Sequence, residues 1–244
     1  MKIQWYPGHM TKAMRMMQEN IKLVDVIIEV TDARIPQSSR NPDIAKLAVN
    51  KIRVILLNKY DLADDNKTKE WKEYYESEGY HTALVNSKAG KGVRQVNDVI
   101  MKACKEKIER DRKRGIINRP VRAMIVGIPN VGKSTFINSF AGKACAKTGD
   151  KPGITKGKQW IRLNKNVELL DTPGVLWPKF DDEKTGTNLA MIGSVNDEII
   201  QLQELACEMI LAMKKLYNEQ LVRYLGFDTD AKPHEILERY AVKR

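Results

Sequence analysis

GIPNVGKS, residues 127–134, is the stretch that decides the fold of this chain. The apolar run Val121–Val126 before it predicts a strand, and Lys133–Ala141 predicts a helix, which is the context that a phosphate-binding loop requires. Glycines at both ends let the backbone wrap closely and point its N–H groups at phosphate oxygens, while the helix N-terminus adds partial positive charge. The stretch therefore predicts a nucleotide site at the end of a buried strand.

The same loop holds the groups that are expected to handle the phosphates. Lys133 is expected to reach the β- and γ-phosphates and to count among the catalytic groups, and the Ser134 hydroxyl is expected to bind Mg²⁺. The expected nucleotide contacts of this region come from Asn130, Val131, Gly132, Lys133, Ser134 and Thr135. Because ATP and GTP share their phosphates, the loop alone does not distinguish between them.

A four-residue stretch after another predicted strand indicates guanine. It reads Asn58-Lys59-Tyr60-Asp61 and follows the apolar run 54–57, so it lies at the carboxyl edge of the sheet. Asp61 can accept two N–H bonds from guanine that adenine cannot offer, and the Lys59 stem can lie over the ring. Asn58 can reach the base edge or brace the phosphate loop. After the next strand, Ser87, Lys88 and Ala89 suit a further contact to guanine.

Two more residues are expected at the metal and the γ-phosphate. Asp171-Thr172-Pro173-Gly174 follows the apolar run 167–170, which places the Asp171 carboxylate near Mg²⁺ and the Gly174 N–H near the γ-phosphate. Thr155 lies between this motif and the phosphate loop, and its hydroxyl is expected to close over Mg²⁺ as a further catalytic group. The alternative reading of Thr155, which follows a Pro-Gly pair, is a plain turn residue.

Strand and helix patterns alternate through most of the chain. This alternation predicts an α/β fold with a mostly parallel sheet, and residues 159–163 add a strand that pairs with 167–170 through a short turn. Expected strands are 24–30, 54–57, 82–85, 121–126 and 167–170, and expected helices are 12–23, 41–49, 67–79, 93–112 and 133–141. From about residue 196 only helical patterns remain, at 198–225 and after Pro233.

The order of the motifs is unusual. The guanine motif precedes the phosphate loop, whereas Ras-like GTPases begin with the phosphate loop and end with the guanine motif. We therefore predict a P-loop GTPase fold with circularly permuted Ras-like topology over residues 1–195, with 1–22 as an entry segment and helix. A small all-helical C-terminal domain is predicted over 196–244. The segment after Gly174, which is expected to respond to the γ-phosphate, leads into these helices. This connectivity suits a switch that repositions the helices.

Several motifs resemble one family of GTPases. Asp32-Ala33-Arg34-Ile35-Pro36, the permuted order, and 171–178 resemble the permuted GTPases of ribosome biogenesis, and 3–10 narrows the resemblance to the ribosome biogenesis GTPase A family. The resemblance implies a GTPase that binds the large ribosomal subunit precursor and its rRNA, is stimulated by the ribosome, and acts late in maturation. Members of that family generally carry a longer helical tail than this chain.

The source of hydrolytic rate is left open by the sequence. Ras-like enzymes orient the attacking water with a Gln soon after the Asp-x-x-Gly motif, but here Val175, Leu176 and Trp177 follow Gly174. Asn130 is typical of GTPases that bind K⁺ as an activator, although a turn asparagine is the alternative. The family resemblance gives His9 a catalytic part, against simple packing of the N-terminus. A slow-hydrolysing GTP-binding scaffold or sensor is therefore the alternative function.

Arginines and overall charge complete the sequence-based expectations. Arg34 and Arg40 are further candidates for hydrolysis, but a salt-bridged surface is the favoured reading of both. The net charge of +11, with nine basic and three acidic residues over 102–122, favours a nucleic-acid partner over a merely solubilising surface. Three scattered cysteines and no apolar run long enough for a bilayer predict a cytoplasmic protein without membrane contact, and we expect a monomer.

Overall fold

The computed structural model describes residues 3–146, 159–180 and 182–243, and of residue 159 the backbone only. The chain forms two compact units, one of Trp5–Pro178 and one of Met1–Gln4 with Lys179–Arg244. The predicted boundary at 195/196 therefore differs from the observed division. The reason is that helix α7 (Glu183–Met191) packs against α8 (Leu202–Leu225), and Ile3 lies beside Gly186 of α7.

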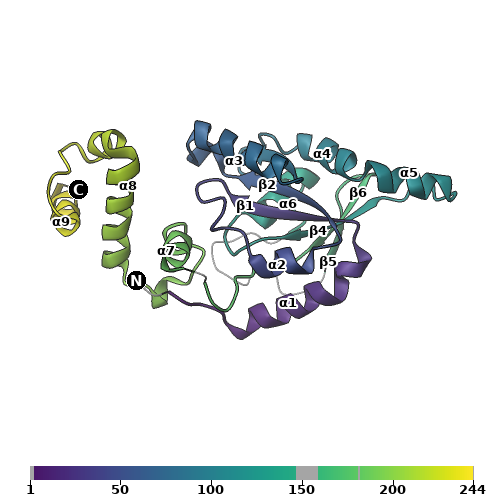
Figure 1. The fold of residues 1–244 in the computed structure, drawn as a ribbon, viewed down its shortest axis with the longest axis horizontal. Helices are drawn as coiled ribbons and strands as arrows, with labels where there is room; N and C mark the ends of the chain where they lie inside the picture. The colour runs from purple at the N-terminus through teal and green to yellow at the C-terminus, as the bar shows by residue number, and fades with distance from the viewer. Residues whose placement is uncertain (1–2, 147–158, 181, 244) are drawn as a thin grey trace. The chain divides into compact units, whose positions relative to one another are not determined.

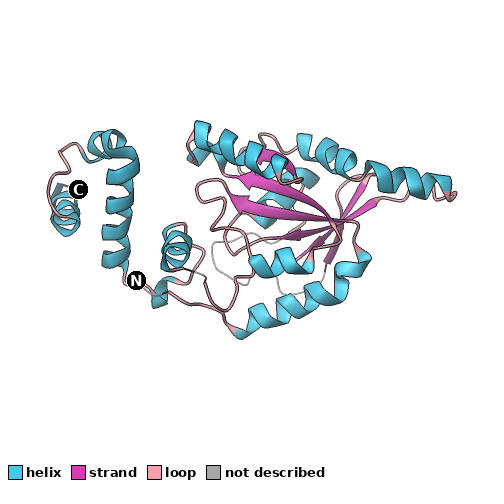
Figure 2. Ribbon diagram, viewed as in Figure 1, coloured by secondary structure: helices cyan, strands magenta, loops and turns pink. Residues whose placement is uncertain are grey.

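The unit Trp5–Pro178 is built on one six-stranded sheet (Figures 1 and 2). The strands are β1 Val26–Asp32, β2 Ile52–Asn58, β3 His81–Val85, β4 Val121–Val126, β5 Gln159–Arg162 and β6 Val167–Asp171. Their order is β3-β2-β1-β4-β6-β5, and every pair is parallel except the β5–β6 hairpin. The predicted α/β fold with a mostly parallel sheet is confirmed.

The strand register gathers the motif residues at one edge of this sheet. Asp32 at the end of β1 pairs with Asn58 at the end of β2, and Asn58 pairs with Val85 at the end of β3. The phosphate loop leaves the same end of β4, and Asp171 ends the parallel strand β6. Because parallel strands point the same way, motifs that are far apart in sequence meet beyond their carboxyl ends.

The helices of this unit depart from the expected ranges mainly at their ends. They are α1 Gly8–Asn20, α2 Pro42–Leu47, α3 Asp65–Ser77, α4 Gln95–Ala103, α5 Lys105–Lys113 and α6 Lys133–Ala141. The single helix predicted over 93–112 is divided at Cys104, whose φ and ψ of −93° and 8° leave the helical region. Helix α1 begins earlier than predicted because Pro7 is extended at its N-cap and Gly8 starts the first turn.

A buried charge fixes the loop after β1. Glu29 is 1% exposed and accepts hydrogen bonds from Arg53 at 2.8 Å and from Arg40 at 3.3 Å. The Arg40 guanidinium also lies 4.8 Å from the centre of the Tyr80 ring. Burying a carboxylate is costly unless it is paired, so these contacts hold the segment around Arg40 against the sheet. Arg40 thus has the salt-bridged role that was the favoured sequence-based reading.

The secondary-structure elements that the structure describes in the second unit are all helices. Helices α7 and α8 are followed by α9 (Pro233–Lys243), which opens at the predicted proline. Its core is formed by Ile210, Leu221, Leu225 and Ile236. The long predicted helix is observed as α8, but Tyr217 has φ −145° and ψ 47° and kinks it. Among the described helices of the chain, none is long and apolar enough to cross a membrane.

Candidate nucleotide-binding site

Asn58 connects three segments at the carboxyl edge of the sheet. Its side-chain amide donates to the Val131 carbonyl at 2.8 Å, which fixes the phosphate loop. Its Oδ1 accepts from the Ser87 N–H at 3.1 Å and from the Ser87 hydroxyl at 2.8 Å. Asn58 is 2% exposed, so each of these bonds is made away from water. Of the two predicted roles, the structure gives Asn58 the bracing one.

Lys59 makes a second link between the base motif and the phosphate loop. Its Nζ donates to the Asn130 carbonyl at 2.8 Å and lies 3.0 Å from Asp32 Oδ2. Lys59 itself has φ +58°, a left-handed conformation that turns the chain toward the loop. The Lys59 side chain is therefore held between the phosphate loop and Asp32.

Asp32 is the counter-ion that orders this corner. It is fully buried and receives a bidentate pair from Arg34, at 2.8 and 2.7 Å. Burial alone would raise the pKa of Asp32, but its hydrogen bonds with Arg34 and the charge of Lys59 outweigh burial and lower it. Arg34 is thus committed to an ion pair, in agreement with the favoured sequence-based reading.

The residues expected to contact guanine follow the carboxyl ends of β2 and β3 and differ in exposure. Asp61 is exposed in a 3₁₀ turn, Tyr60–Leu62, and its charge helps Asp32 to raise the pKa of Arg34. Ser87 is buried, whereas Lys88 and Ala89 are exposed. The Ala89 N–H donates to the Asn86 side chain at 2.9 Å, which closes the turn.

The phosphate loop has the conformation that its glycines predict. Gly132 has φ +97°, and a Cβ there would lie 2.4 Å from the Asn58 amide nitrogen. Lys133 follows as the first residue of α6 and donates from Nζ to the Gly127 and Ile128 carbonyls, at 3.0 and 2.7 Å. Burial lowers the pKa of Lys133 to about 8, although the charge of Asp171 acts against this. Ser134 and Thr135 are half-buried in the same first turn.

The segment after β6 lies directly on the phosphate loop. The Val175 N–H donates to the Gly127 carbonyl at 3.2 Å, and the Thr172 hydroxyl donates to the Ile125 carbonyl at 2.6 Å. A Cβ on Gly174 would lie 2.7 Å from Pro129 Cα, so this approach requires glycine. The following Val175, Leu176 and Trp177 are at most 5% exposed, and none can orient a water as a glutamine does.

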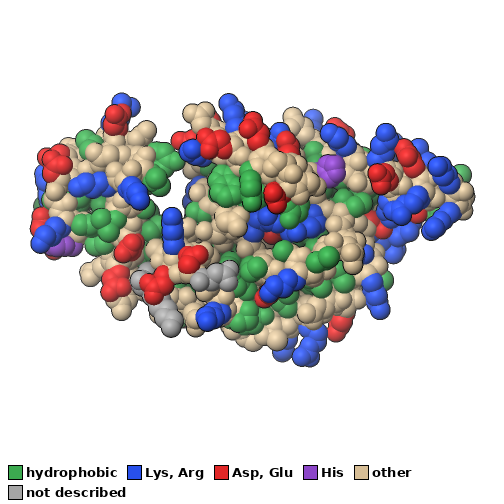
Figure 3. Space-filling view, viewed as in Figure 1, with side chains coloured by type: hydrophobic (Ala, Val, Ile, Leu, Met, Phe, Trp, Pro, Cys, Tyr) green, Lys and Arg blue, Asp and Glu red, His purple; other side chains and the backbone are tan. Residues whose placement is uncertain are grey.

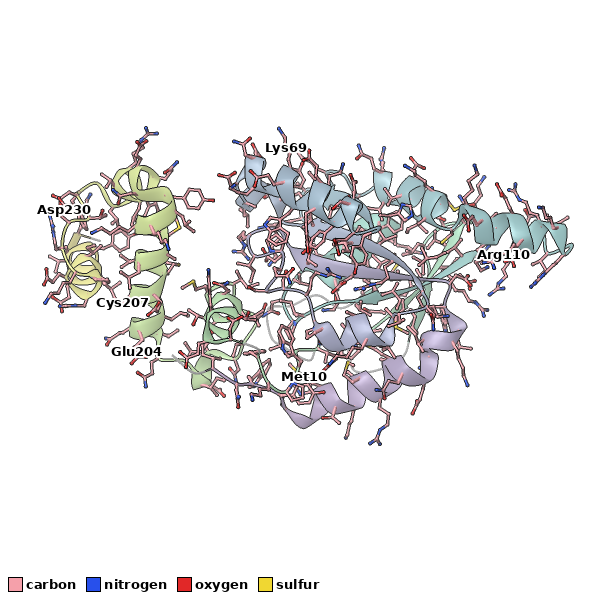
Figure 4. The ribbon with its side chains drawn as sticks, in the orientation of Figure 1. Met10, Lys69, Arg110, Glu204, Cys207 and Asp230 are labelled. Carbon is pink, nitrogen blue, oxygen red and sulfur yellow. The ribbon has the colours of Figure 1, made fainter. Side chains whose placement is uncertain are left out.

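Two contacts that the sequence did not suggest hold this segment from the other side. The Asn41 amide donates to the Val175 carbonyl at 3.0 Å, across 134 residues of chain. The Leu176 N–H donates to the Met10 sulfur at 3.4 Å, and Met10 belongs to the first turn of α1 (labelled in Figure 4). His9, the preceding residue, is exposed and lies edge-on to Trp5 with 6.2 Å between ring centres.

The structure thus joins several of the predicted site residues by direct contacts, whereas Asp61, Lys88 and Ala89 lie exposed after β2 and β3. Asn58, Lys59, Ser87, the phosphate loop, Asp171 and Gly174 are joined by the contacts above. His9 is exposed and is the sequence neighbour of Met10, which contacts Leu176. Thr155 lies outside the described residues. Sequence reasoning missed Asp32 and Asn41 as site residues, although the buried position of Asp32 at a strand end was a usable signal.

The oxygen-bearing side chains of the site suit Mg²⁺. The Asp171 carboxylate is 2% exposed and close enough to Lys133 to influence its pKa, and Ser134 adjoins Lys133. A hydroxyl and a carboxylate are hard oxygen donors of the kind that Mg²⁺ uses beside substrate phosphates. No group of three His, Cys, Asp or Glu residues in the described parts of the chain could hold a metal without such phosphates.

Comparison with known proteins identifies relatives over the full length of the chain. A family model described as "50S ribosome-binding GTPase" matches residues 122–237, beginning at the strand before the phosphate loop. "Ribosome biogenesis GTPase A" of Bacillus pumilus is 47% identical over 245 aligned residues, covering 100% of this chain and 87% of the relative. "Mitochondrial ribosome-associated GTPase 1" of Bos taurus is 34% identical, covering 98% and 74%.

A solved structure agrees with these sequence relatives. The crystal structure of GNP-bound YlqF from T. maritima is 28% identical, with a TM-score of 0.59 over 95% of this chain and 91% of that one. The fold, the permuted motif order and the relatives all indicate GTP binding and hydrolysis together with a role in ribosome assembly. This chain therefore belongs to the ribosome biogenesis GTPase A family of circularly permuted P-loop GTPases.

Proposed function

We propose that the protein hydrolyses GTP on the large ribosomal subunit precursor, late in its maturation, and that the particle stimulates turnover. The observation that carries the proposal is the buried run Val175–Trp177, which occupies the place of a water-orienting side chain beside the phosphate loop. A site built in this way needs a further group to reach an efficient rate. The ribosomal names of its relatives and its net charge of +11 support rRNA as the partner.

In this proposal different site residues bind the base, the phosphates and the metal ion of the nucleotide complex. Asp61 binds the guanine edge, while Asn58 and Lys59 hold the base motif onto the phosphate loop. Lys133 and the loop N–H groups bind the phosphates, and Gly174 reports the γ-phosphate. Ser134, Thr155 and Asp171 would hold Mg²⁺, which would neutralise charge at the phosphates.

The missing rate is proposed to come from two sources. K⁺ bound at Asn130 would add positive charge near the phosphates, where an arginine acts in other GTPases. His9 would orient the water once the particle repositions the first turn of α1, which already contacts the γ-phosphate-sensing segment through Met10. We further propose that the protein acts in the cytoplasm as a monomer, which light scattering with and without nucleotide would test.

The deciding experiment measures GTP turnover in K⁺ and in Na⁺ buffer, each with and without large-subunit precursors. We expect turnover to rise with the particles and to require K⁺ for the full rise. His9→Ala is expected to lose the stimulated rate while keeping GDP affinity, and unchanged stimulation in a folded variant would remove His9 from the mechanism.

A second candidate function is a slow-hydrolysing GTP sensor, which the buried Val175–Trp177 run also favours. Co-sedimentation with large-subunit precursors, compared between a GTP analogue and GDP, separates the readings. Nucleotide-dependent sedimentation without stimulated turnover supports the sensor. Equal sedimentation in both nucleotide states contradicts a switch of either kind.

A further inference from the structure

We propose that the exposed sheet face around Trp160 binds an unpaired segment of RNA, with Trp160 stacking on a base. We call this surface the Trp160 face and define it as Arg122, Lys143, Trp160 and Arg162. The inference deepens the proposed function, because it assigns a contact for rRNA on the GTPase unit, and it therefore rests on that function.

The strand register places the central residues of this face side by side. Arg122 of β4 pairs with Glu168 of β6, and Glu168 pairs with Arg162 of β5. Trp160 lies two residues before Arg162 on the same strand, so both side chains point to the same face. The intervening Ile161 is 6% exposed and faces the core, whereas Trp160 is 36% exposed. The row therefore presents an indole and two guanidinium groups to solvent.

The indole is oriented before any partner binds. The Arg122 guanidinium lies 5.5 Å from the centre of the Trp160 ring and also 3.5 Å from the Glu168 carboxylate. Trp160 borders a hollow of about 420 Å³, which Arg122 does not line. The residues that line the hollow are Lys143, Ala144, Cys145, Trp160, Ile161 and Arg162. The indole is thus supported by Arg122 and still open toward a space of ligand size.

The charge of the face fits a phosphate backbone. Within the parts of the chain that the structure describes, Glu168 is the only acidic side chain in an ion pair with the face, and it pairs with Arg122. No carboxylate is paired with Lys143 or Arg162 in those same parts, and both are exposed. Cations that track a backbone, placed around an aromatic side chain, are the combination that single-stranded nucleic acids bind.

The acidic residue Asp25 links this face to α5. Asp25 accepts from the Arg122 N–H at 2.9 Å and also pairs with Lys107 of α5 and with Arg119. Helix α5 buries none of its side chains, and Figure 3 shows Lys and Arg side chains gathered over it. An RNA segment bound at Trp160 that continued along the sheet toward α5 would therefore meet the cations of that helix.

RNA is favoured over an acidic protein because of the indole. An acidic peptide would satisfy the cations but would leave the ring without a planar partner. A duplex would satisfy the cations too, yet its bases are stacked on one another and are not available to an indole. Only unpaired nucleotides offer phosphate and an open base together.

The test measures anisotropy of a fluorescein-labelled 12-nucleotide oligouridylate with the full chain and a GTP analogue. Trp160→Ala is expected to weaken binding about tenfold and Trp160→Phe to restore it to within about twofold, because a phenyl ring also stacks. Arg162→Glu is expected to weaken binding at least tenfold. The matched control Lys69→Glu, on α3 at the opposite edge of the sheet (Figure 4), is expected to leave it unchanged.

The inference is overturned if Trp160→Ala binds like the wild type. It is also overturned if an abasic strand, a duplex or a polyglutamate peptide of the same length competes equally well. GDP affinity reports folding of each variant, and if Trp160→Ala does not fold, the exposed substitutions Arg162→Glu and Lys143→Glu decide the outcome.

Co-sedimentation with large-subunit precursors separates the two proposals. Wild-type protein that does not sediment contradicts the proposed function, whatever the oligonucleotide shows. Wild-type and Trp160→Ala proteins that sediment equally, with equal oligonucleotide affinity, contradict this inference alone.

Discussion

At the scale of single residues, the site depends on side chains that satisfy several backbone groups at once. Asn58 uses both ends of its amide, one for the Val131 carbonyl and one for Ser87. Lys59 divides its ammonium between Asp32 and the Asn130 carbonyl. A buried polar group left without its partner costs more than the bond itself contributes, so losses at such residues spread to every segment that they join.

Asn58→Ala is therefore expected to damage both stability and nucleotide binding. The change leaves the Val131 carbonyl and the Ser87 N–H buried without their partner, at a cost of about 2–4 kcal/mol in the free energy of unfolding. GDP affinity is expected to fall at least tenfold because the phosphate loop loses its brace. Urea unfolding and GDP titration measure the two effects.

Asn86→Ala is the matched control for this change. Asn86 also accepts from a backbone N–H, that of Ala89, but this bond is exposed to water. We expect a loss under about 1 kcal/mol. Equal losses in the two variants would contradict the bridging role of Asn58.

Lys133 is expected to make GDP affinity depend on pH. In the protein alone its pKa is lowered to about 8 by burial, whereas bound phosphates would raise it. Binding thus favours the protonated ammonium, so affinity is full below pH 8 and falls above it, by about tenfold at pH 9 relative to pH 7. Fluorescence titration across this range measures the slope, and calorimetry in two buffers measures the proton uptake.

The control is Lys133→Arg, because a guanidinium does not lose its proton in this range. Any slope that persists in this variant comes from the guanine base or from other groups. A wild-type slope no steeper than that of the variant would show that Lys133 is charged at all of these pH values.

At the scale of elements, the cap of α2 also holds the segment after β6. Asn41 Oδ1 accepts from the Asp43 N–H at 2.9 Å and so begins α2, while its amide donates to the Val175 carbonyl. Helix α2 follows the loop that Arg40 pins to the sheet through Glu29. The segment after β6 is thus tied to the start of α2 by one residue with two roles.

Asn41→Ala is expected to change GTP turnover as well as stability. Loss of the cap costs about 1 kcal/mol, and the Val175 carbonyl loses its buried donor in addition. Because Val175 is released from one side, the basal rate of GTP hydrolysis is expected to change at least twofold. Single-turnover hydrolysis and urea unfolding are the measurements.

Asp64→Ala provides the comparison, because Asp64 caps α3 by accepting from the Lys67 N–H at 2.9 Å, a bond that stays within the first turn of that helix. This variant is expected to lose about 1 kcal/mol of stability and to hydrolyse GTP at the wild-type rate. If both variants keep the wild-type rate, Asn41 acts only as a helix cap.

The elements themselves were largely predictable, and the exceptions have physical reasons. Each predicted strand exists, because short apolar runs rich in β-branched residues and bounded by turn residues favour strands over helices. Helix α7 was missed because its nine residues carry only a short apolar pattern, despite the Asp182 cap on Thr185. The break at Cys104 was missed because no proline or glycine marks it.

The site was predictable wherever a motif carried its own chemistry. The phosphate loop, Asn58 and Lys59 lie together as their spacing suggested. Asn41 was not assigned because its partner Val175 is 134 residues away. Asp32 was not assigned because its link to Lys59 joins two separate strand ends. The buried Glu29 in the middle of β1 likewise reads as an exposed position until Arg40 and Arg53 are placed beside it.

At the scale of the whole molecule, the charge of +11 predicts a strong effect of salt on particle binding. Each phosphate that a Lys or Arg neutralises releases a counterion, so affinity falls with a power of the salt concentration. We expect the affinity for large-subunit precursors to fall at least about tenfold between 50 and 200 mM KCl. Co-sedimentation at a series of KCl concentrations gives the slope.

Variants of the Trp160 face separate the contribution of charge to this salt dependence from the contribution of base stacking to affinity. Arg162→Glu is expected to reduce the slope, whereas Trp160→Ala is expected to lower affinity at each salt concentration with the slope unchanged. The same reduction of slope by Lys69→Glu would mean that only total charge matters.

The strand order has a consequence for how the chain is made. Strands β1, β2 and β3 form one contiguous half of the sheet and leave the translating ribosome before β4 exists, since synthesis proceeds from the N-terminus. Until residues 121–126 emerge, β1 keeps an open edge, and all seven of its residues are buried in the finished fold. The half of the sheet that carries Asn58–Asp61 is thus synthesised first, and β1 lacks one neighbour until β4 of the half that carries the phosphate loop follows.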